Sequence, residues 1–102
     1  MEVTLQSLDD CPGWKTTASY LFTLVGEGWD VVIGYEPIDT HRLAVARDFH
    51  GSPTVLIDGA DPFADEKATI GLACRTYPTE DGPARSPSMS QLRQAVAIAI
   101  KE

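Results

Sequence analysis

Cys11-Pro12-Gly13-Trp14 lies between an alternating apolar segment, residues 2–8, and a helical segment, residues 14–25. It places a thiol where a strand gives way to a helix, and Pro12 suits the first helical position because no N–H is needed there. A helix N-terminus carries unpaired N–H groups and the positive end of the helix dipole, which favour thiolate over thiol. Asp9 and Asp10 oppose this effect, since nearby negative charges disfavour a thiolate. We therefore expect a modestly activated thiol at Cys11.

A second informative stretch, His50-Gly51-Ser52-Pro53, opens a β-rich run over residues 54–57. Together with the cysteine at the first strand-to-helix junction, this proline resembles the thioredoxin-like superfamily, including its small thioredoxin and glutaredoxin members. The second cysteine of that family's Cys-x-x-Cys motif is missing, and Trp14 stands in its place.

The resemblance implies a site geometry. Cys11 would face the Ser52-Pro53 peptide bond, which is cis in that family, and we expect the same bond here to be cis. The backbone of Ser52 would pair with a partner's backbone as an added strand, so Ser52 and Pro53 would bind substrate. Trp14 would either shield the sulfur or stack on a ligand, although a large apolar residue on the inner face of a helix is also typical of a core.

The rest of the chain alternates between strand and helix patterns. Strands are predicted at residues 2–8, 29–35, 54–57 and 69–77, and helices at 14–25, from Asp39 or Thr40 to about 48, and from Ser88 onward. Residues 61–66 resemble one helical turn, and residues 80–87 a loop. The apolar spacing predicts two buried helix faces, formed by Trp14, Ala18, Leu21, Leu24 and Val25 and by Met89, Leu92, Ala95, Val96 and Ala99.

This order, β-α-β-α-β-β-α, predicts an α/β layer structure. It matches the minimal thioredoxin-like fold, which implies a three-layer domain with a four-stranded mixed sheet flanked by helices. A chain of 102 residues is normally one domain, so residues 1–102 are expected to form a single thioredoxin-like domain.

Composition limits the classes of partner. The formal charge of −7 disfavours nucleic-acid binding, which uses basic patches, and docking on an anionic membrane. No basic leader or long apolar run is present, and two cysteines are few for a disulfide-stapled secreted domain. We therefore expect a cytoplasmic protein whose partner is a protein or small-molecule thiol or disulfide.

The second cysteine, Cys74, falls in the predicted strand 69–77. In the expected sheet that strand lies two positions from the strand leading to Cys11, so their axes would be roughly 9–10 Å apart. A disulfide needs Cα atoms within about 7 Å, so direct pairing is not expected and a buried, inert Cys74 is the preferred interpretation. The alternatives are a Cys11–Cys74 redox pair and joint binding of a soft metal.

These observations predict a thiol–disulfide oxidoreductase with Cys11 as its single nucleophile and an external thiol, such as glutathione, as its reductant. No metal site is expected, since two histidines and two cysteines are widely scattered, and no cofactor beyond the external thiol is predicted. His50 lies close enough to the expected site for proton transfer, but is more simply a solvated helix end. The alternative functions are a redox-inactive binding module for a peptide or protein and thiol capture of a soft metal.

Overall fold

The computed structural model describes residues 1–65 and 67–101 of the 102-residue chain, so Glu66 and Glu102 lie outside the described residues. The predicted helical turn over 61–66 and the predicted domain over 1–102 each include at least one of these residues, so both predictions are compared with the structure only over the described residues. The elements in chain order are β1 (Glu2–Ser7), α1 (Gly13–Gly26), β2 (Val32–Pro37), α2 (His41–Ala46), β3 (Thr54–Ile57), β4 (Tyr77–Thr79), β5 (Gly82–Ala84) and α3 (Met89–Lys101).

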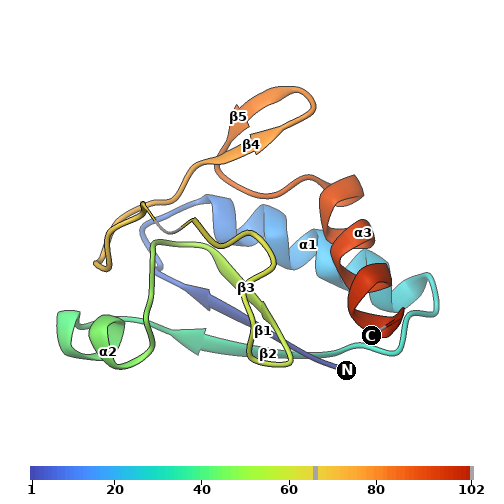
Figure 1. Cartoon of the computed structure of the whole chain (residues 1–102), viewed down its shortest axis with the longest axis horizontal. Coiled ribbons are helices and arrows are strands. Elements are labelled where there is room, and N and C mark those ends of the chain that lie inside the picture. The colour runs from blue at the N-terminus through green and yellow to red at the C-terminus, as the bar shows by residue number, and fades with distance from the viewer. Residues whose placement is uncertain (66, 102) are drawn as a thin grey trace.

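The main sheet has three strands in the order β2-β1-β3 (Figure 1). The central strand β1 runs parallel to β2 and antiparallel to β3. A parallel neighbour requires a crossover, which α1 supplies, and the sheet is therefore mixed, as expected. The strand expected at 29–35 is shifted to Val32–Pro37. It is an edge strand of the sheet, and most of its residues are exposed.

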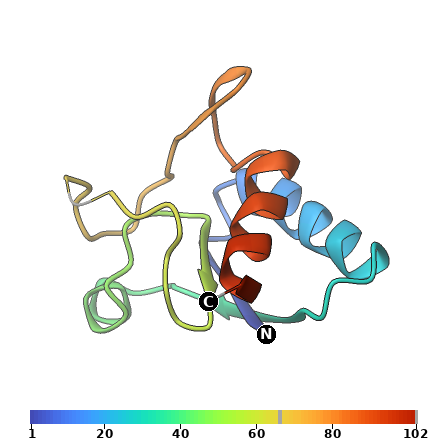
Figure 2. The same ribbon diagram turned by 45° about the vertical axis from the view of Figure 1, so that its right-hand side comes forward.

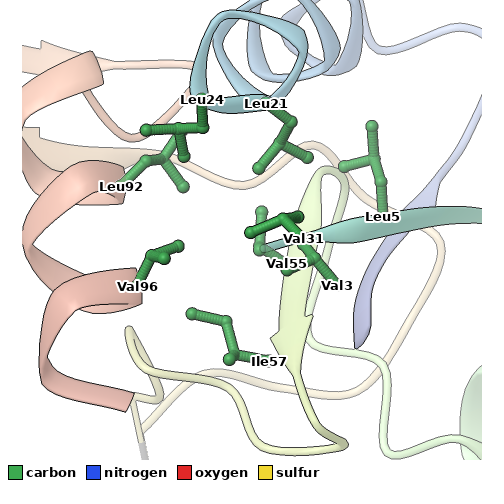
Figure 3. Packing of buried hydrophobic residues seen from close by; sticks show 9 residues of the cluster. All are labelled: Val3, Leu5, Leu21, Leu24, Val31, Val55, Ile57, Leu92 and Val96. Atoms are coloured by element: carbon green, nitrogen blue, oxygen red, sulfur yellow. The ribbon is translucent and has the colours of Figure 1, made fainter. Parts of the chain in front are cut away.

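The core lies between this sheet and the two long helices, which lie on one side of it and pack against each other at an angle (Figure 2). Leu21 and Leu24 of α1 meet Leu92 and Val96 of α3 above the apolar side chains of β1 and β3 (Figure 3). Both helix faces follow the predicted spacing except at one position, Val25, which is 42% exposed and not buried. A second, smaller cluster gathers Ile38, Ala44 and Phe49 around α2.

Helix boundaries follow local capping chemistry. Thr40 caps α2 by accepting a hydrogen bond from the backbone N–H of Leu43, as the sequence indicates, but the helix ends at Ala46 and not near residue 48. Ahead of α3, Ser88 and Gln91 form the predicted capping box: each side chain accepts a hydrogen bond from the other residue's backbone N–H, at 3.1 and 2.9 Å.

Within the described ranges, no helix combines the length and apolar character that a bilayer crossing needs.

The predicted four-stranded sheet is wrong. The structure has a three-stranded mixed sheet and a separate two-stranded sheet, β4–β5, which projects away from it (Figures 1 and 2). The expected strand over 69–77 is mostly irregular, and residues 80–87, expected to be a loop, contain β5.

The reason lies just after β3. Asp58 and Gly59, both with positive φ, form a tight two-residue turn that pairs Ile57 with Ala60 through two backbone hydrogen bonds. Pro62 follows, and because proline has no N–H it cannot continue a strand ladder along β3. The chain leaves the sheet edge there, in a turn where Asp61 accepts a hydrogen bond from the N–H of Phe63 in place of the predicted helical turn. It returns only at the opposite end of β3.

Candidate functional site

Cys11 lies in the short connection between β1 and α1, one residue before Pro12, the N-cap residue of the helix. Its backbone N–H donates to the carbonyl of Leu8, and its carbonyl accepts from Trp14 N–H at 3.3 Å. The residue is 3% exposed. The thiol position therefore adjoins the first turn of α1, as the sequence predicts, but it is covered by the rest of the chain.

The covering segment carries the second cysteine. Cys11 and Cys74 form a disulfide with their Cα atoms 5.6 Å apart, so the prediction that Cys74 lies too far away to pair is wrong. The prediction that Cys74 is buried is also wrong, because the residue is exposed. Both errors have one cause: without a fourth strand beside β3, residues 73–75 instead cross the end of β3 next to Cys11.

Ser52 holds this crossing segment in place. Its N–H donates to the carbonyl of Ala73 and its carbonyl accepts from the N–H of Arg75, both at 2.8 Å, which makes a parallel bridge centred on Cys74. The Ser52 hydroxyl accepts a hydrogen bond from Leu8 N–H at 2.9 Å and so ties the bridge to the segment leading to Cys11. The Ser52–Pro53 peptide bond is cis, as expected. The backbone groups predicted to receive a partner's strand are thus paired with the protein's own chain.

Arg75, directly after Cys74, is the most heavily bonded side chain near the disulfide. It is 9% exposed, and its guanidinium forms an ion pair with Asp61 at 2.8 Å and donates to the Thr54 hydroxyl at 3.3 Å and to the carbonyl of Phe63. A buried guanidinium is costly unless paired and hydrogen-bonded, and these contacts satisfy it. They attach the segment 73–75 to both β3 and the turn that follows it.

Tyr77 completes this group. Its ring lies 4.5 Å from the Arg75 guanidinium carbon, and its hydroxyl donates to the carbonyl of Pro53. Burial raises the pKa of the Tyr77 phenol far above its usual value, an effect only partly offset by the positive charge of Arg75. Tyr77 therefore stays protonated and keeps donating to Pro53 at any physiological pH.

Gly51 allows the close packing on this side. It has a φ of +115°, which favours glycine, and a Cβ placed there would lie 3.0 Å from the Cβ of Arg75. The backbone conformation before Ser52 and the close packing of Arg75 therefore both depend on Gly51.

Of the two other residues considered for the site, Trp14 lies against the main core, whereas His50 lies close to the segment that carries Cys74. Trp14 is partly buried and packs against the main core, with Lys15 6.0 Å from its ring centre. Its buried indole Nε1 has no hydrogen-bond partner among the described residues. The Nδ1 of His50 pairs with the carbonyl of Ala68 at 2.9 Å, so this ring anchors the loop before Cys74 and is not simply solvated.

A cavity of about 660 Å³ opens beside the disulfide. Its walls include Cys74, Arg75 and Tyr77 together with His50 and Lys67. No group of three or more His, Cys, Asp or Glu side chains in residues 1–65 and 67–101 is placed to bind a metal ion. Cys74, which is exposed, adjoins this cavity.

The chain matches no protein-family model, no curated protein and no solved structure. The chemistry proposed for it therefore rests on its own geometry.

The sequence indicated Cys11, Ser52 and Pro53, which the structure brings together, but no sequence motif gave a role at the site to Arg75, Tyr77 or Asp61. Local sequence features mark two of these three residues. Arg75 follows a cysteine directly, and Asp61 precedes the proline that stops the strand. Neither signal identifies the other as its partner, because the pairing depends on where the chain returns to the sheet.

Proposed function

We propose that the protein is a thioredoxin-like thiol–disulfide oxidoreductase in which Cys11 is the nucleophile and Cys74 the second thiol. The observation that supports this most strongly is the disulfide between a cysteine at a helix N-terminus and a cysteine paired with Ser52, directly before Pro53. Cys74 replaces the external thiol that a one-cysteine site requires, so the single-cysteine form of the mechanism is not retained.

In the reductive half of the cycle, an external thiolate attacks the sulfur of Cys74, since Cys74 is exposed and Cys11 is buried. The Cys11–Cys74 bond breaks, a mixed disulfide forms on Cys74, and Cys11 leaves as a thiolate next to the positive end of α1. A second external thiol, such as glutathione, attacks the mixed disulfide. It releases Cys74 and leaves the external pair oxidised.

In the second half, the Cys11 thiolate attacks a substrate disulfide, and one substrate sulfur leaves as a thiolate. Cys74 then attacks the sulfur of Cys11, releases the other substrate sulfur and reforms the Cys11–Cys74 bond. Two electrons pass to the substrate, and no other oxidant or reductant is required.

Two single variants test the cycle. Cys74→Ser is expected to accumulate a mixed disulfide with glutathione on Cys11, because the thiol that resolves it is missing. Cys11→Ser is expected to accumulate much less, because its exposed Cys74 thiol lacks the stabilisation that the N-terminus of α1 gives to a thiolate at Cys11. The measurement is the intact mass of each reduced variant after incubation with glutathione disulfide, with the site of attachment read from peptides. Equal labelling of both variants would contradict the assignment of Cys11 as the nucleophile.

A second candidate function, a redox-inactive binding module, is favoured by the burial of Cys11. In that case the disulfide is a structural crosslink. The folded protein would then keep its Cys11–Cys74 bond in millimolar glutathione and exchange with no small-molecule disulfide. Soft-metal capture instead predicts that the reduced protein binds a thiophilic metal and that Cys11→Ser abolishes this binding.

A further inference from the structure

We infer that Arg75 is a positioning residue which, through Asp61, keeps Cys74 next to Cys11 after the disulfide has been reduced. This inference rests on the proposed function and adds to it the element that determines how readily the pair closes.

The two cysteines are held in different ways. Cys11 lies in a short connection between two regular elements, β1 and α1. Cys74 lies in an irregular segment between β3 and β4 that has no regular secondary structure of its own over the described residues 58–65 and 67–76. Without other contacts, reduction would free this segment, because loop segments gain conformational freedom when a crosslink opens. The position of Cys74 relative to Cys11 would then be lost.

The contacts of Arg75 do not involve either sulfur, so reduction leaves them in place. The Arg75–Asp61 ion pair is mostly buried, with side-chain exposures of 8% and 16%. Burial makes such a pair hard to break, because removing one partner leaves an uncompensated charge inside the protein. With the 2.8 Å bond from Arg75 N–H to the Ser52 carbonyl, the residue after Cys74 is attached through both its backbone and its side chain.

This attachment raises the effective concentration of Cys74 at Cys11. An intramolecular thiol that is already in position resolves a mixed disulfide faster than one that must first be ordered. It also favours the closed disulfide at equilibrium. Arg75 touches no reacting atom, so its effect is on the ring-closure equilibrium and not on the chemistry of the sulfurs.

The measurement is the equilibrium between the full-length protein and glutathione. Protein disulfide plus two glutathione thiols gives protein dithiol plus glutathione disulfide, and the populations are read after acid quenching. Arg75→Met is expected to lower the ratio of closed to open protein by about 10- to 100-fold, because the disulfide still holds the segment of the oxidised variant whereas the segment of the reduced variant is freed. The energy of one charge-assisted hydrogen bond limits the size of this change. Arg75→Lys, which keeps the charge at Asp61, is expected to recover part of the loss.

Two further variants sharpen the test. Asp61→Asn retains an oxygen that can accept from Phe63 N–H but removes the charge facing Arg75, and is expected to lower the ratio in the same direction. Arg93→Met, the matched control, removes an ion pair with Glu27 at the opposite end of α1 and is expected to leave the ratio unchanged. In concentrated urea all variants should give the same ratio, since the tertiary contacts are then absent.

An unchanged ratio in folded Arg75→Met overturns the inference. If that variant does not fold even when oxidised, an unchanged ratio in Asp61→Asn overturns it instead. The proposed function fails separately: a protein whose ratio falls as expected but which exchanges with no substrate disulfide contradicts the catalytic cycle and not the role of Arg75.

Discussion

At the scale of single residues, the site depends on a few positions where a larger side chain does not fit. Gly13, the first residue of α1, is buried, and a Cβ placed on it would lie 2.1 Å from the carbonyl oxygen of Arg85. The helix that begins beside Cys11 therefore packs backbone to backbone against the connection between β5 and α3. Only glycine permits this approach without a shift of the backbone.

Gly13→Ala is expected to lower the free energy of unfolding by about 1–3 kcal/mol, because the new methyl group overpacks against a backbone carbonyl. Gly26→Ala in the same helix is the matched control, since a Cβ there meets nothing within 4 Å. It is expected to be neutral or to stabilise by about 0.5–1 kcal/mol, as alanine costs less conformational entropy than glycine. Urea denaturation of both variants measures the difference. Equal stabilities would contradict the packing of Gly13.

At the scale of elements, β1 and β2 are joined by side chains as well as by their backbones. The buried amide of Gln6 donates to Glu36, its register partner on the neighbouring strand, at 2.8 Å, and Arg47 beyond α2 donates to the other carboxylate oxygen at 3.0 Å. The hydrogen bond from Gln6, followed by that from Arg47, lowers the pKa of Glu36 below its usual 4.5. This cluster stabilises the sheet edge only while Glu36 is ionised.

The lowered pKa of Glu36 determines how the stability of the protein changes with pH. Because the pKa of Glu36 is lower in the folded state, its contribution is complete above pH 4.5 and is lost as the pH falls through the folded-state value. Glu36→Ala is expected to cost about 1 kcal/mol at neutral pH, a small value because the pair is partly exposed. The difference from the wild type should shrink in acid. Denaturation curves over a pH series test this, and a difference that does not vary with pH would contradict it.

At the scale of the whole molecule, the disulfide joins the connection between β1 and α1 to the long segment between β3 and β4. It spans 63 positions of sequence, and closing a loop of that length stabilises a folded chain by about 4 kcal/mol in the chain-entropy model. The redox state of the pair is therefore coupled to global stability.

Reduction of the wild type, or replacement by Cys74→Ser, is expected to lower the free energy of unfolding by about 4 kcal/mol. The check is chemical denaturation with and without a reductant. Cys74→Ser is the informative control, since a reductant should not change its stability. A wild-type protein equally stable in both redox states would contradict this prediction.

The sequence by itself determined the order of the first elements, the cap and inner face of α3, and the junction that carries Cys11. Each follows from local physics: apolar periodicity, capping residues and turn residues act over a few positions. Only the tertiary structure decided that there is no fourth strand in the main sheet and that Cys74 reaches Cys11.

That outcome depends on contacts distant in sequence. Residues 69–77 have strand-like composition, but a strand needs a neighbouring strand edge with which to pair. Pro62, earlier in the chain, ends the pairing along β3. The segment is placed instead by Ser52, by the Arg75–Asp61 pair and by the disulfide. No local sequence pattern predicts these contacts, because the residues that form them are far apart in sequence and come together only when the whole chain has folded.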